Sequence, residues 1–193
     1  VEEGLKLDFA DAISNERKLF EECIESPQRQ GLIHSFFAER ANTKIPELKD
    51  CTPIELNKIG IIGGGTMGTG ISMAAMNAGF DVIMVEQNDE AIQKAEAKIN
   101  STYDRSVKLN RITTEQKNKT MEMFSATIDF SDLKDRDLII EAVFENMDVK
   151  KEVFMKLNEI CSQNCILASN TSYLNVNEIA SVVDNPSRVI GLH

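Results

Sequence analysis

The chain has 193 residues, 42% of them hydrophobic, which is enough for one sizeable folded core and an accessory segment. Its formal net charge of −10 argues against binding to nucleic acid or to an anionic membrane surface. No apolar run approaches the roughly 20 residues that a membrane-spanning helix needs. The four cysteines form no CxxC pair and no metal-like spacing with the two histidines, so we expect reduced thiols and no metal site.

Residues 1–56 have a different pattern from the rest of the chain. Apolar residues recur at helical spacing over 9–20 and again over 32–37. Pro27 either breaks the first of these helices or begins the second at its first turn. Residues 44–53 are polar and turn-rich, as is typical of a linker. Because two short amphipathic helices cannot bury their apolar faces alone, we expect this segment to pack on another domain.

From Asn57 onward, apolar strands alternate with helices, which is the pattern of a parallel sheet. We expect strands at 58–62, 81–86, 124–127, 138–143, 165–169 and 188–191, and helices at 66–78, 89–101, 148–161 and 175–183. The interval from about 100 to 122 is too long for a simple crossover, and Thr113 and Gln116 have the spacing of a capping box. We therefore predict a helical hairpin between the second helix and the third strand.

The most informative feature is a glycine-rich turn directly after the first predicted strand. Gly63, Gly65 and Gly68 form the pattern G-x-G-x-x-G, and a helix follows. The free N–H groups and the dipole of such a helix attract a pyrophosphate. Gly63 would make the turn, Gly65 would let the phosphates approach, and Gly68 would let the helix pack on the strand. Thr66 and Met67 belong to the same turn, so we expect them to contact the dinucleotide as well.

A carboxylate stands where recognition of a ribose requires one. The second predicted strand ends in Glu86, about 20 residues after the glycines. A carboxylate there accepts hydrogen bonds from both ribose hydroxyls and would repel a 2′-phosphate. The next residues, Gln87 and Asn88, supply no arginine for such a phosphate. The sequence therefore favours NAD over NADP, with Glu86 and Gln87 as cofactor contacts.

Polar residues follow the last three predicted strands at their carboxyl ends, where open α/β sheets bind ligands. The fourth strand is apolar except for Glu141 and is followed by Glu145, which is either an acid in the first turn of the next helix or a ligand contact. Asn170 and Ser172 follow the fifth strand, and His193 follows the sixth. Asn170 either holds its loop or touches the nicotinamide ribose. This convergence favours an enzyme over a nucleotide sensor.

His193 and Ser172 are the candidate catalytic residues. An imidazole titrates near neutral pH, so it can take the proton of a hydroxyl while a hydride leaves the same carbon. Ser172 is free to hydrogen-bond a substrate oxygen, because Asn175 is already placed to cap the following helix. The alternative for a single histidine at the end of a strand is a purely structural role.

The predicted hairpin region carries a basic strip, 94–119, with a charge of +4 in a chain of −10. We consider two interpretations: a solvated surface that keeps the hairpin soluble, or a docking surface for an anionic ligand tail such as the phosphates of coenzyme A. The strip contains Lys94, Lys98, Arg105, Lys108, Arg111, Lys117 and Lys119 against Glu96, Asp104 and Glu115.

Taken together, these motifs resemble the L-3-hydroxyacyl-CoA dehydrogenases of fatty-acid β-oxidation. The resemblance covers 57–193 and lies in IGIIGGGTMGTGI, VEQN, DLIIEAVFEN, SNTSYL and VIGLH, of which the combination of SNTS with GLH is specific. It implies a Rossmann-type α/β fold, a doubly wound, mostly parallel sheet with a helical hairpin insertion, preceded by a short helical segment. It also implies NAD as the cofactor, His193 as the catalytic base and Ser172 as the residue that orients the 3-hydroxyl or 3-keto group.

The same resemblance suggests further contacts. Glu145 and Lys150 match positions that line the NAD site in the family. Ser101 and Thr102 lie near a position that contacts coenzyme A. Lys108 stands beside the position where mitochondrial enzymes carry a lysine, so it is a candidate replacement for that contact.

Residues 37–46 resemble the linker between hydratase and dehydrogenase in peroxisomal multifunctional enzymes. This implies a hydratase domain in the parent protein and a peroxisomal location, with the mitochondrial matrix or the cytoplasm as alternatives. The family continues beyond the position of His193 with a helical domain that orients the histidine and often forms a homodimer. We therefore expect the chain alone to bind NAD but to turn over acyl-CoA poorly. The rival interpretations are a related hydroxyacid dehydrogenase with another substrate and a non-catalytic dinucleotide-binding or assembly module.

Overall fold

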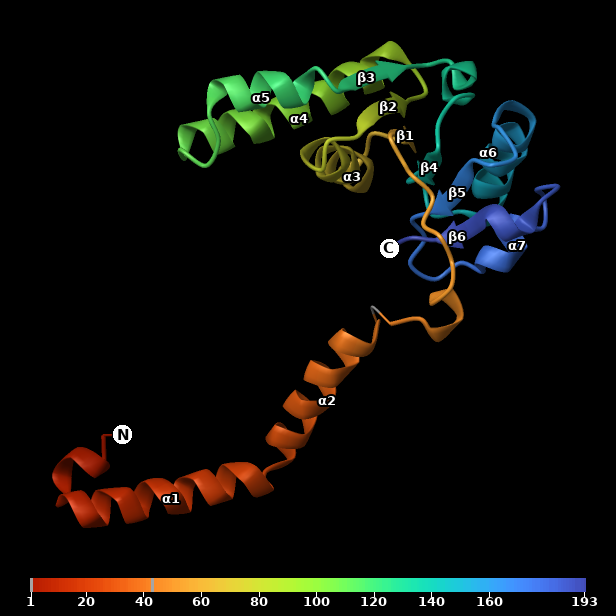
Figure 1. The fold of residues 1–193 in the computed structure, drawn as a ribbon. Coiled ribbons are helices and arrows are strands. Elements are labelled where there is room, and N and C mark those ends of the chain that lie inside the picture. The colour runs from red at the N-terminus through yellow and green to blue at the C-terminus, as the bar shows by residue number, and fades with distance from the viewer. Residues whose placement is uncertain (1, 43) are drawn as a thin grey trace. The chain divides into compact units, whose positions relative to one another are not determined.

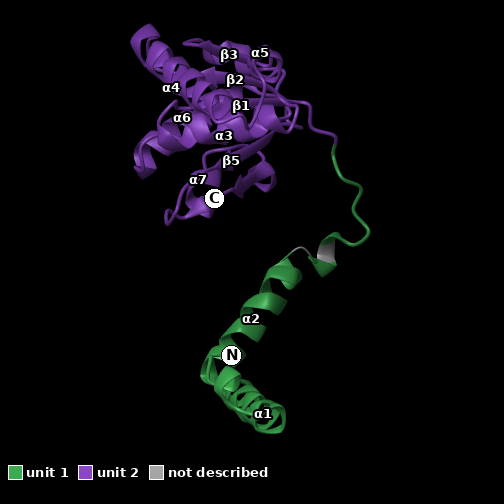
Figure 2. Cartoon of the chain, turned by 90° about the vertical axis from the view of Figure 1, so that its left-hand side faces the viewer, with its two compact units in different colours: residues 1–54 green, residues 55–193 purple. Residues whose placement is uncertain are grey.

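The structure is a computed structural model that describes residues 2–42 and 44–193. The chain divides into two compact units, Val1–Ile54 and Glu55–His193, coloured differently in Figure 2, and each is described by itself. In the described part of the chain, no helix has both the length and the apolar character that crossing a membrane demands.

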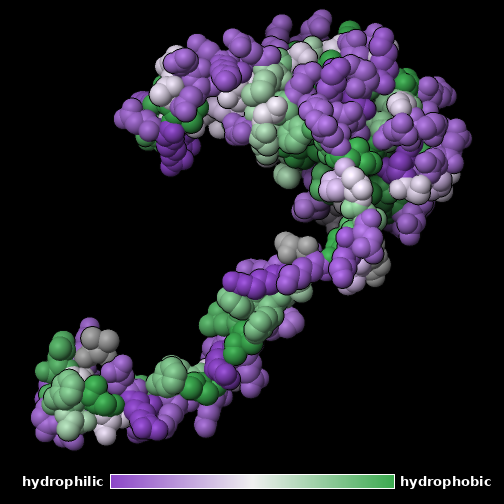
Figure 3. All heavy atoms as spheres, viewed as in Figure 1, coloured by the Kyte–Doolittle hydropathy of each residue, from purple (hydrophilic) through white to green (hydrophobic). Residues whose placement is uncertain are grey.

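The first unit consists mainly of two helices, α1 (Phe9–Glu25) and α2 (Pro27–Asn42), with the short 3-10 turns η1 (Gly4–Lys6) and η2 (Pro46–Leu48). Helix α1 begins at Asp8, whose carboxylate accepts a hydrogen bond from the Asp11 N–H at 3.0 Å. Pro27 begins α2, so the second of the two interpretations of this proline is correct. No residue of α1 or α2 is buried within the described structure, and Figure 3 shows hydrophobic residues on the surface of both helices. Packing of these faces on another domain therefore remains a prediction.

The second unit is a six-stranded parallel sheet in the order β3-β2-β1-β4-β5-β6, with helices on both faces (Figure 1). The Rossmann-type fold class is thereby confirmed. The strands are β1 (Lys58–Ile62), β2 (Asp81–Val85), β3 (Phe124–Thr127), β4 (Leu138–Glu141), β5 (Ile166–Ser169) and β6 (Val189–Gly191). The helices are α3 (Thr66–Asn77), α4 (Asp89–Lys108), α5 (Thr114–Met121), α6 (Met147–Ile160) and α7 (Val176–Ala180), with 3-10 turns η3 (Phe130–Leu133) and η4 (Pro186–Arg188).

Two apolar cores, one on each face, hold the sheet between its helices. On one face, α3 and α4 cover residues such as Ile59 and Ile61. On the other face, α6 and α7 cover residues such as Ile62, with Phe154 fully buried among them. Strands that are covered on both sides are mostly apolar, which explains the continuous apolar runs 59–62 in β1 and 138–140 in β4.

The predicted helical hairpin is present, with one difference in its boundaries. Helix α4 does not end near residue 101 but continues to Lys108, so the hairpin is formed by α4 itself and by α5. Thr113 and Gln116 form the predicted capping box at the start of α5, with reciprocal hydrogen bonds of 3.1 and 2.8 Å. Asn110, whose φ is 53°, allows the chain to reverse between the two helices.

Candidate active site

The glycine-rich turn joins β1 to α3 in the expected way. Gly63 has a φ of 95°, which a residue with a side chain rarely adopts, and its N–H donates to Val85 O at 3.0 Å. A Cβ on Gly68 would lie 1.7 Å from Gly63 O, so only glycine lets the first turn of α3 pack this closely on the end of β1. A Cβ on Gly65, in contrast, would meet no atom within 4 Å. The turn therefore presents an open backbone surface at the N-terminus of α3.

A cavity of about 660 Å³ adjoins this turn at the carboxyl ends of β1, β2 and β4. It brings together most of the residues predicted to contact the dinucleotide: Gly63, Gly65, Thr66, Met67, Glu86 and Gln87. Gly68 lies buried beneath the turn, as its packing role requires. The remaining wall was not predicted from the sequence; it includes Phe130, Ala142, Val143, Phe144 and the α6 residues Val149, Glu152, Val153 and Lys156. These residues come together only when the sheet has formed, so no local sequence pattern predicts that they line one cavity.

Glu86 faces the glycine turn, as expected for a ribose-binding carboxylate. One of its oxygens accepts a hydrogen bond from the Gly64 N–H, and the other accepts one from the Gln87 N–H at 3.0 Å. The open surface at Gly65, the helix N-terminus and this carboxylate together fit the pyrophosphate and adjoining ribose of a dinucleotide.

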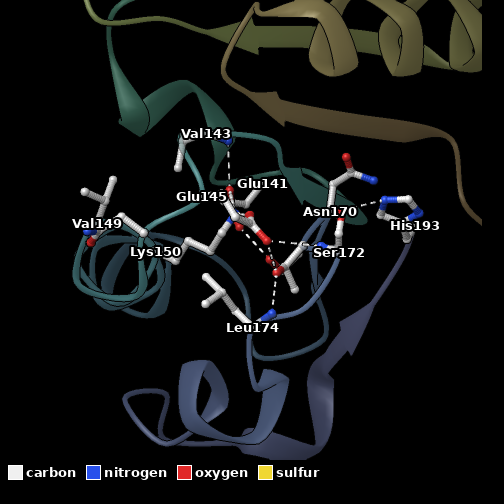
Figure 4. A network of polar contacts seen from close by, with 12 residues as sticks. Glu141, Val143, Glu145, Val149, Lys150, Asn170, Ser172, Leu174 and His193 are labelled. Carbon is white, nitrogen blue, oxygen red and sulfur yellow. Dashed lines mark hydrogen bonds and ion pairs between the residues drawn. The ribbon is translucent and has the colours of Figure 1, made fainter.

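His193 and Ser172 are brought together at the same edge of the sheet. Ser172 Oγ lies 2.9 Å from His193 Nε2, and this contact is drawn as a dashed line in Figure 4. Asn170 fixes the relative position of the two segments that carry them, because its Nδ2 donates to Leu192 O at 2.8 Å. This contact agrees with the loop-holding interpretation of Asn170, and its contact with the nicotinamide ribose stays a prediction. The imidazole can bond to the serine hydroxyl as an acceptor or as a donor, depending on its tautomer.

Glu145 contacts the loop that carries Ser172. It precedes Asn146, the N-cap of α6, and is thus not an acid of the helix's first turn. Its Oε1 accepts hydrogen bonds from the Thr171 hydroxyl and from the Ser172 N–H, the latter at 3.1 Å. Partial burial raises the pKa of the Glu145 carboxyl, but the hydrogen bonds from Thr171 and Lys150 and the charge of Lys150 outweigh it, so the pKa lies below its usual value. Glu145 is consequently ionised at neutral pH.

Lys150 does not line the cavity, which corrects the expectation that it belongs to the NAD-contacting surface. Its side chain is 0% exposed, and its ammonium group pairs with Glu141 at 2.7 Å and with Glu145 at 3.1 Å. A lysine has to be paired when it is buried this deeply. The role of its partner Glu141 was not predicted, although a single charge in an otherwise apolar strand was the available signal.

The residues predicted to contact coenzyme A lie on α4. Ser101 and Thr102 are exposed, and their hydroxyls donate to Lys98 O at 3.0 and 2.8 Å. Lys108 is exposed in the last turn of the helix. Lys98 itself reaches the cofactor turn, since its Nζ lies 3.3 Å from Thr66 Oγ1.

Comparisons with known proteins agree with this geometry. Residues 58–193 match the family model "3-hydroxyacyl-CoA dehydrogenase, NAD binding domain". The chain is 35% identical over 195 aligned residues to a peroxisomal fatty acid beta-oxidation multifunctional protein of Oryza sativa subsp. japonica, and also 35% identical to a glyoxysomal counterpart of Brassica napus. Both alignments cover 100% of this chain but only 27% of the relative, so the chain spans about a quarter of these proteins.

Solved structures of dehydrogenases share the fold of the second unit. The (S)-3-hydroxybutyryl-CoA dehydrogenase of Ralstonia eutropha is 36% identical with a TM-score of 0.70, covering 72% of this chain and 49% of that one. The dehydrogenase part of multifunctional enzyme 1 from C. elegans is 36% identical with a TM-score of 0.66, covering 72% of this chain and 32% of that one. The chain therefore belongs to the family of the NAD-binding domain of 3-hydroxyacyl-CoA dehydrogenases.

Proposed function

We propose that the protein containing this chain oxidises L-3-hydroxyacyl-CoA to 3-ketoacyl-CoA with NAD, as a step of fatty-acid β-oxidation. The observation that carries the proposal is the Ser172–His193 pair, 2.9 Å apart, at the same edge of the sheet as the dinucleotide turn. A general base and a hydroxyl group at this edge suit the oxidation of an alcohol.

The chain's own residues divide the work of this reaction. His193 Nε2 takes the proton of the 3-hydroxyl group, and the Ser172 hydroxyl holds the same oxygen in place by a hydrogen bond. Glu86 and the amides of the glycine turn hold the dinucleotide by its ribose and pyrophosphate. NAD, when bound, supplies the acceptor for the hydride that leaves C3.

Turnover by the intact protein tests the proposal. We expect L-3-hydroxybutyryl-CoA and NAD to give acetoacetyl-CoA and NADH. The reaction is monitored by the absorbance of NADH. NADP should be used with a kcat/KM roughly tenfold or more lower, because its 2′-phosphate would face the Glu86 carboxylate. An intact, folded protein that binds NADH but oxidises no L-3-hydroxyacyl-CoA would instead support a non-catalytic dinucleotide-binding module.

We also propose that the basic strip, residues 94–119 on α4 and α5, binds the phosphates of the acyl-CoA. Lys108→Glu should raise the KM for acyl-CoA roughly fivefold, because one charge pair at a solvated surface contributes about 1 kcal/mol. Lys98 is unsuitable for this test, since its contact with Thr66 would also alter the cofactor turn.

Lys134→Glu is the matched control for Lys108→Glu, because Lys134 is an exposed lysine at the end of η3, outside the strip. Steady-state kinetics at low ionic strength should give a higher KM for acyl-CoA with Lys108→Glu than with Lys134→Glu. Added salt should reduce this difference in KM. Equal KM values for both variants would mean that the strip is only solvated surface.

The larger context is also part of the proposal. We propose that 57–193 act as the NAD-binding domain and 1–56 as a helical linker to a hydratase domain of a multifunctional peroxisomal enzyme. A helical domain following His193 would complete the active site and could form a homodimer. Support comes from the relatives, which are peroxisomal or glyoxysomal multifunctional proteins matched along this whole chain.

A further inference from the structure

A buried ion-pair cluster, formed by Glu141, Glu145 and Lys150, lies beside the loop that carries Ser172, on the side away from His193 (Figure 4). Glu141 and Lys150 are both 0% exposed. The Glu141 carboxylate accepts three hydrogen bonds: from Lys150 Nζ at 2.7 Å, from the Val143 N–H at 2.8 Å and from the Ser169 hydroxyl at 2.6 Å. These donors come from α6, from the segment after β4 and from β5. The carboxylate therefore holds three parts of the fold at one point.

The cluster continues to the catalytic loop through a single carboxylate. Lys150 pairs with Glu145 at 3.1 Å, and the other oxygen of Glu145 accepts from the Thr171 hydroxyl and from the Ser172 N–H. Thr171 Oγ1 also accepts from the Leu174 N–H at 3.0 Å, which closes the loop on itself. An unbroken series of polar contacts thus runs from the centre of the sheet to the backbone of the residue that faces His193.

Neither Glu141 nor Lys150 is placed to touch a ligand. Both are fully buried, and neither lines the 660 Å³ cavity. A buried ion pair is also a poor source of stability, because desolvation of the two charges offsets much of their attraction. The pair instead orients Glu145, since charge-assisted hydrogen bonds hold its side chain in one conformation.

We propose that Glu141 and Lys150 are positioning residues for the proposed dehydrogenation: through Glu145 and Thr171 they fix the Ser172 loop opposite His193. This inference rests on the proposed function. A displacement of a reacting group by about 1 Å can lower a rate by about 10²-fold. Loss of the cluster should therefore reduce kcat and leave the binding of NADH unchanged.

The adjacent lysine provides a matched control. Lys151 also forms an ion pair, with Glu178 at 2.6 Å, but this pair is partly exposed and joins α6 to α7 rather than to the Ser172 loop. Lys151→Met removes the same side chain from the same helix. Any effect shared with Lys151→Met is thus a general effect of losing a lysine from α6.

Two variants of the intact protein test the cluster from different sides. Glu141→Gln/Lys150→Met removes both buried charges together, so that neither is left unpaired in the core. Thr171→Val removes the hydroxyl that joins the loop to Glu145 and leaves the buried pair intact. For each variant, kcat and KM for L-3-hydroxybutyryl-CoA, the Kd for NADH and the thermal unfolding midpoint are measured.

We expect both variants to lower kcat by roughly 10- to 100-fold, with the NADH Kd within about threefold of the wild type. Lys151→Met should retain the kcat of the wild type. If the double variant does not fold, the kcat of Thr171→Val tests the inference, because this variant leaves the buried charges paired.

Three results would overturn the inference. A kcat for Thr171→Val equal to that of Lys151→Met would show that the cluster serves stability alone. A parallel loss of NADH affinity in the double variant would make Lys150 a cofactor-binding residue instead. A wild type that oxidises no L-3-hydroxyacyl-CoA would remove the proposed function and this inference together, whereas the first two results leave the proposed function in place.

Discussion

Replacing His193 by alanine in the intact protein should lower kcat for L-3-hydroxyacyl-CoA oxidation by about 10²- to 10⁴-fold, the range that a positioned general base contributes. The reason is geometric: Nε2 of His193 lies 2.9 Å from the Ser172 hydroxyl, so both groups can reach one substrate oxygen. The Kd for NADH, measured by calorimetry, should stay unchanged, because His193 does not line the dinucleotide cavity.

The second histidine of the chain provides the control for this variant. His34 is exposed on α2, in the unit that contains no residue of the proposed site. His34→Ala should have the kcat of the wild type. A small loss in His193→Ala, equal to that in His34→Ala, would contradict the role of His193 as the base.

Replacing Gly68 by alanine should disrupt the dinucleotide turn. The new Cβ would lie 1.7 Å from Gly63 O, and this neighbour is backbone, which cannot rotate away as a side chain can. Helix α3 would have to move from the end of β1, at a cost of about 3 kcal/mol in the free energy of unfolding. The amides at the start of α3 would move with it. Loss of one such hydrogen bond to a charged phosphate weakens binding of NADH by roughly tenfold or more.

Gly70→Ala is the matched control in the same helix. A Cβ on Gly70 would meet no atom within 4 Å, so alanine should raise stability by about 0.5–1 kcal/mol. Urea unfolding and NADH titration of both variants give the comparison. An NADH Kd for Gly68→Ala like that for Gly70→Ala would show that the close packing of α3 on β1 is not needed for binding.

Much of the sheet could be predicted because its information is local. All six expected strands are present, and all of their ends agree with the structure within two residues. β-Branched and apolar runs with helices between them allow few other arrangements. The predicted end of α4, at residue 101, was wrong. The available signal was that Ala95, Ile99 and Tyr103 continue one face of the helix, which is buried, at a spacing of four residues. The buried face continues to Tyr103, beyond residue 101, and the helix continues past it to Lys108.

The site could be predicted only where its residues follow a motif or the end of a strand. The glycine turn, Glu86 and the meeting of Ser172 with His193 follow from the rule that parallel strands end at one edge. The cluster of Glu141 with Lys150 could not be predicted in the same way, because their pairing depends on how α6 packs against β4. The family resemblance implied that Lys150 lines the NAD site, whereas packing buries its side chain completely in this structure.

The position of β6 in the sheet has a consequence for how the catalytic group is held. This strand has three residues, pairs only with β5 among the described strands, and leads directly to the imidazole. Outer strands with few hydrogen bonds open locally at a lower free energy than the rest of a domain. Local opening of β6 would separate His193 from Ser172 without unfolding the nucleotide site. Catalytic activity can therefore be lost while cofactor affinity is kept.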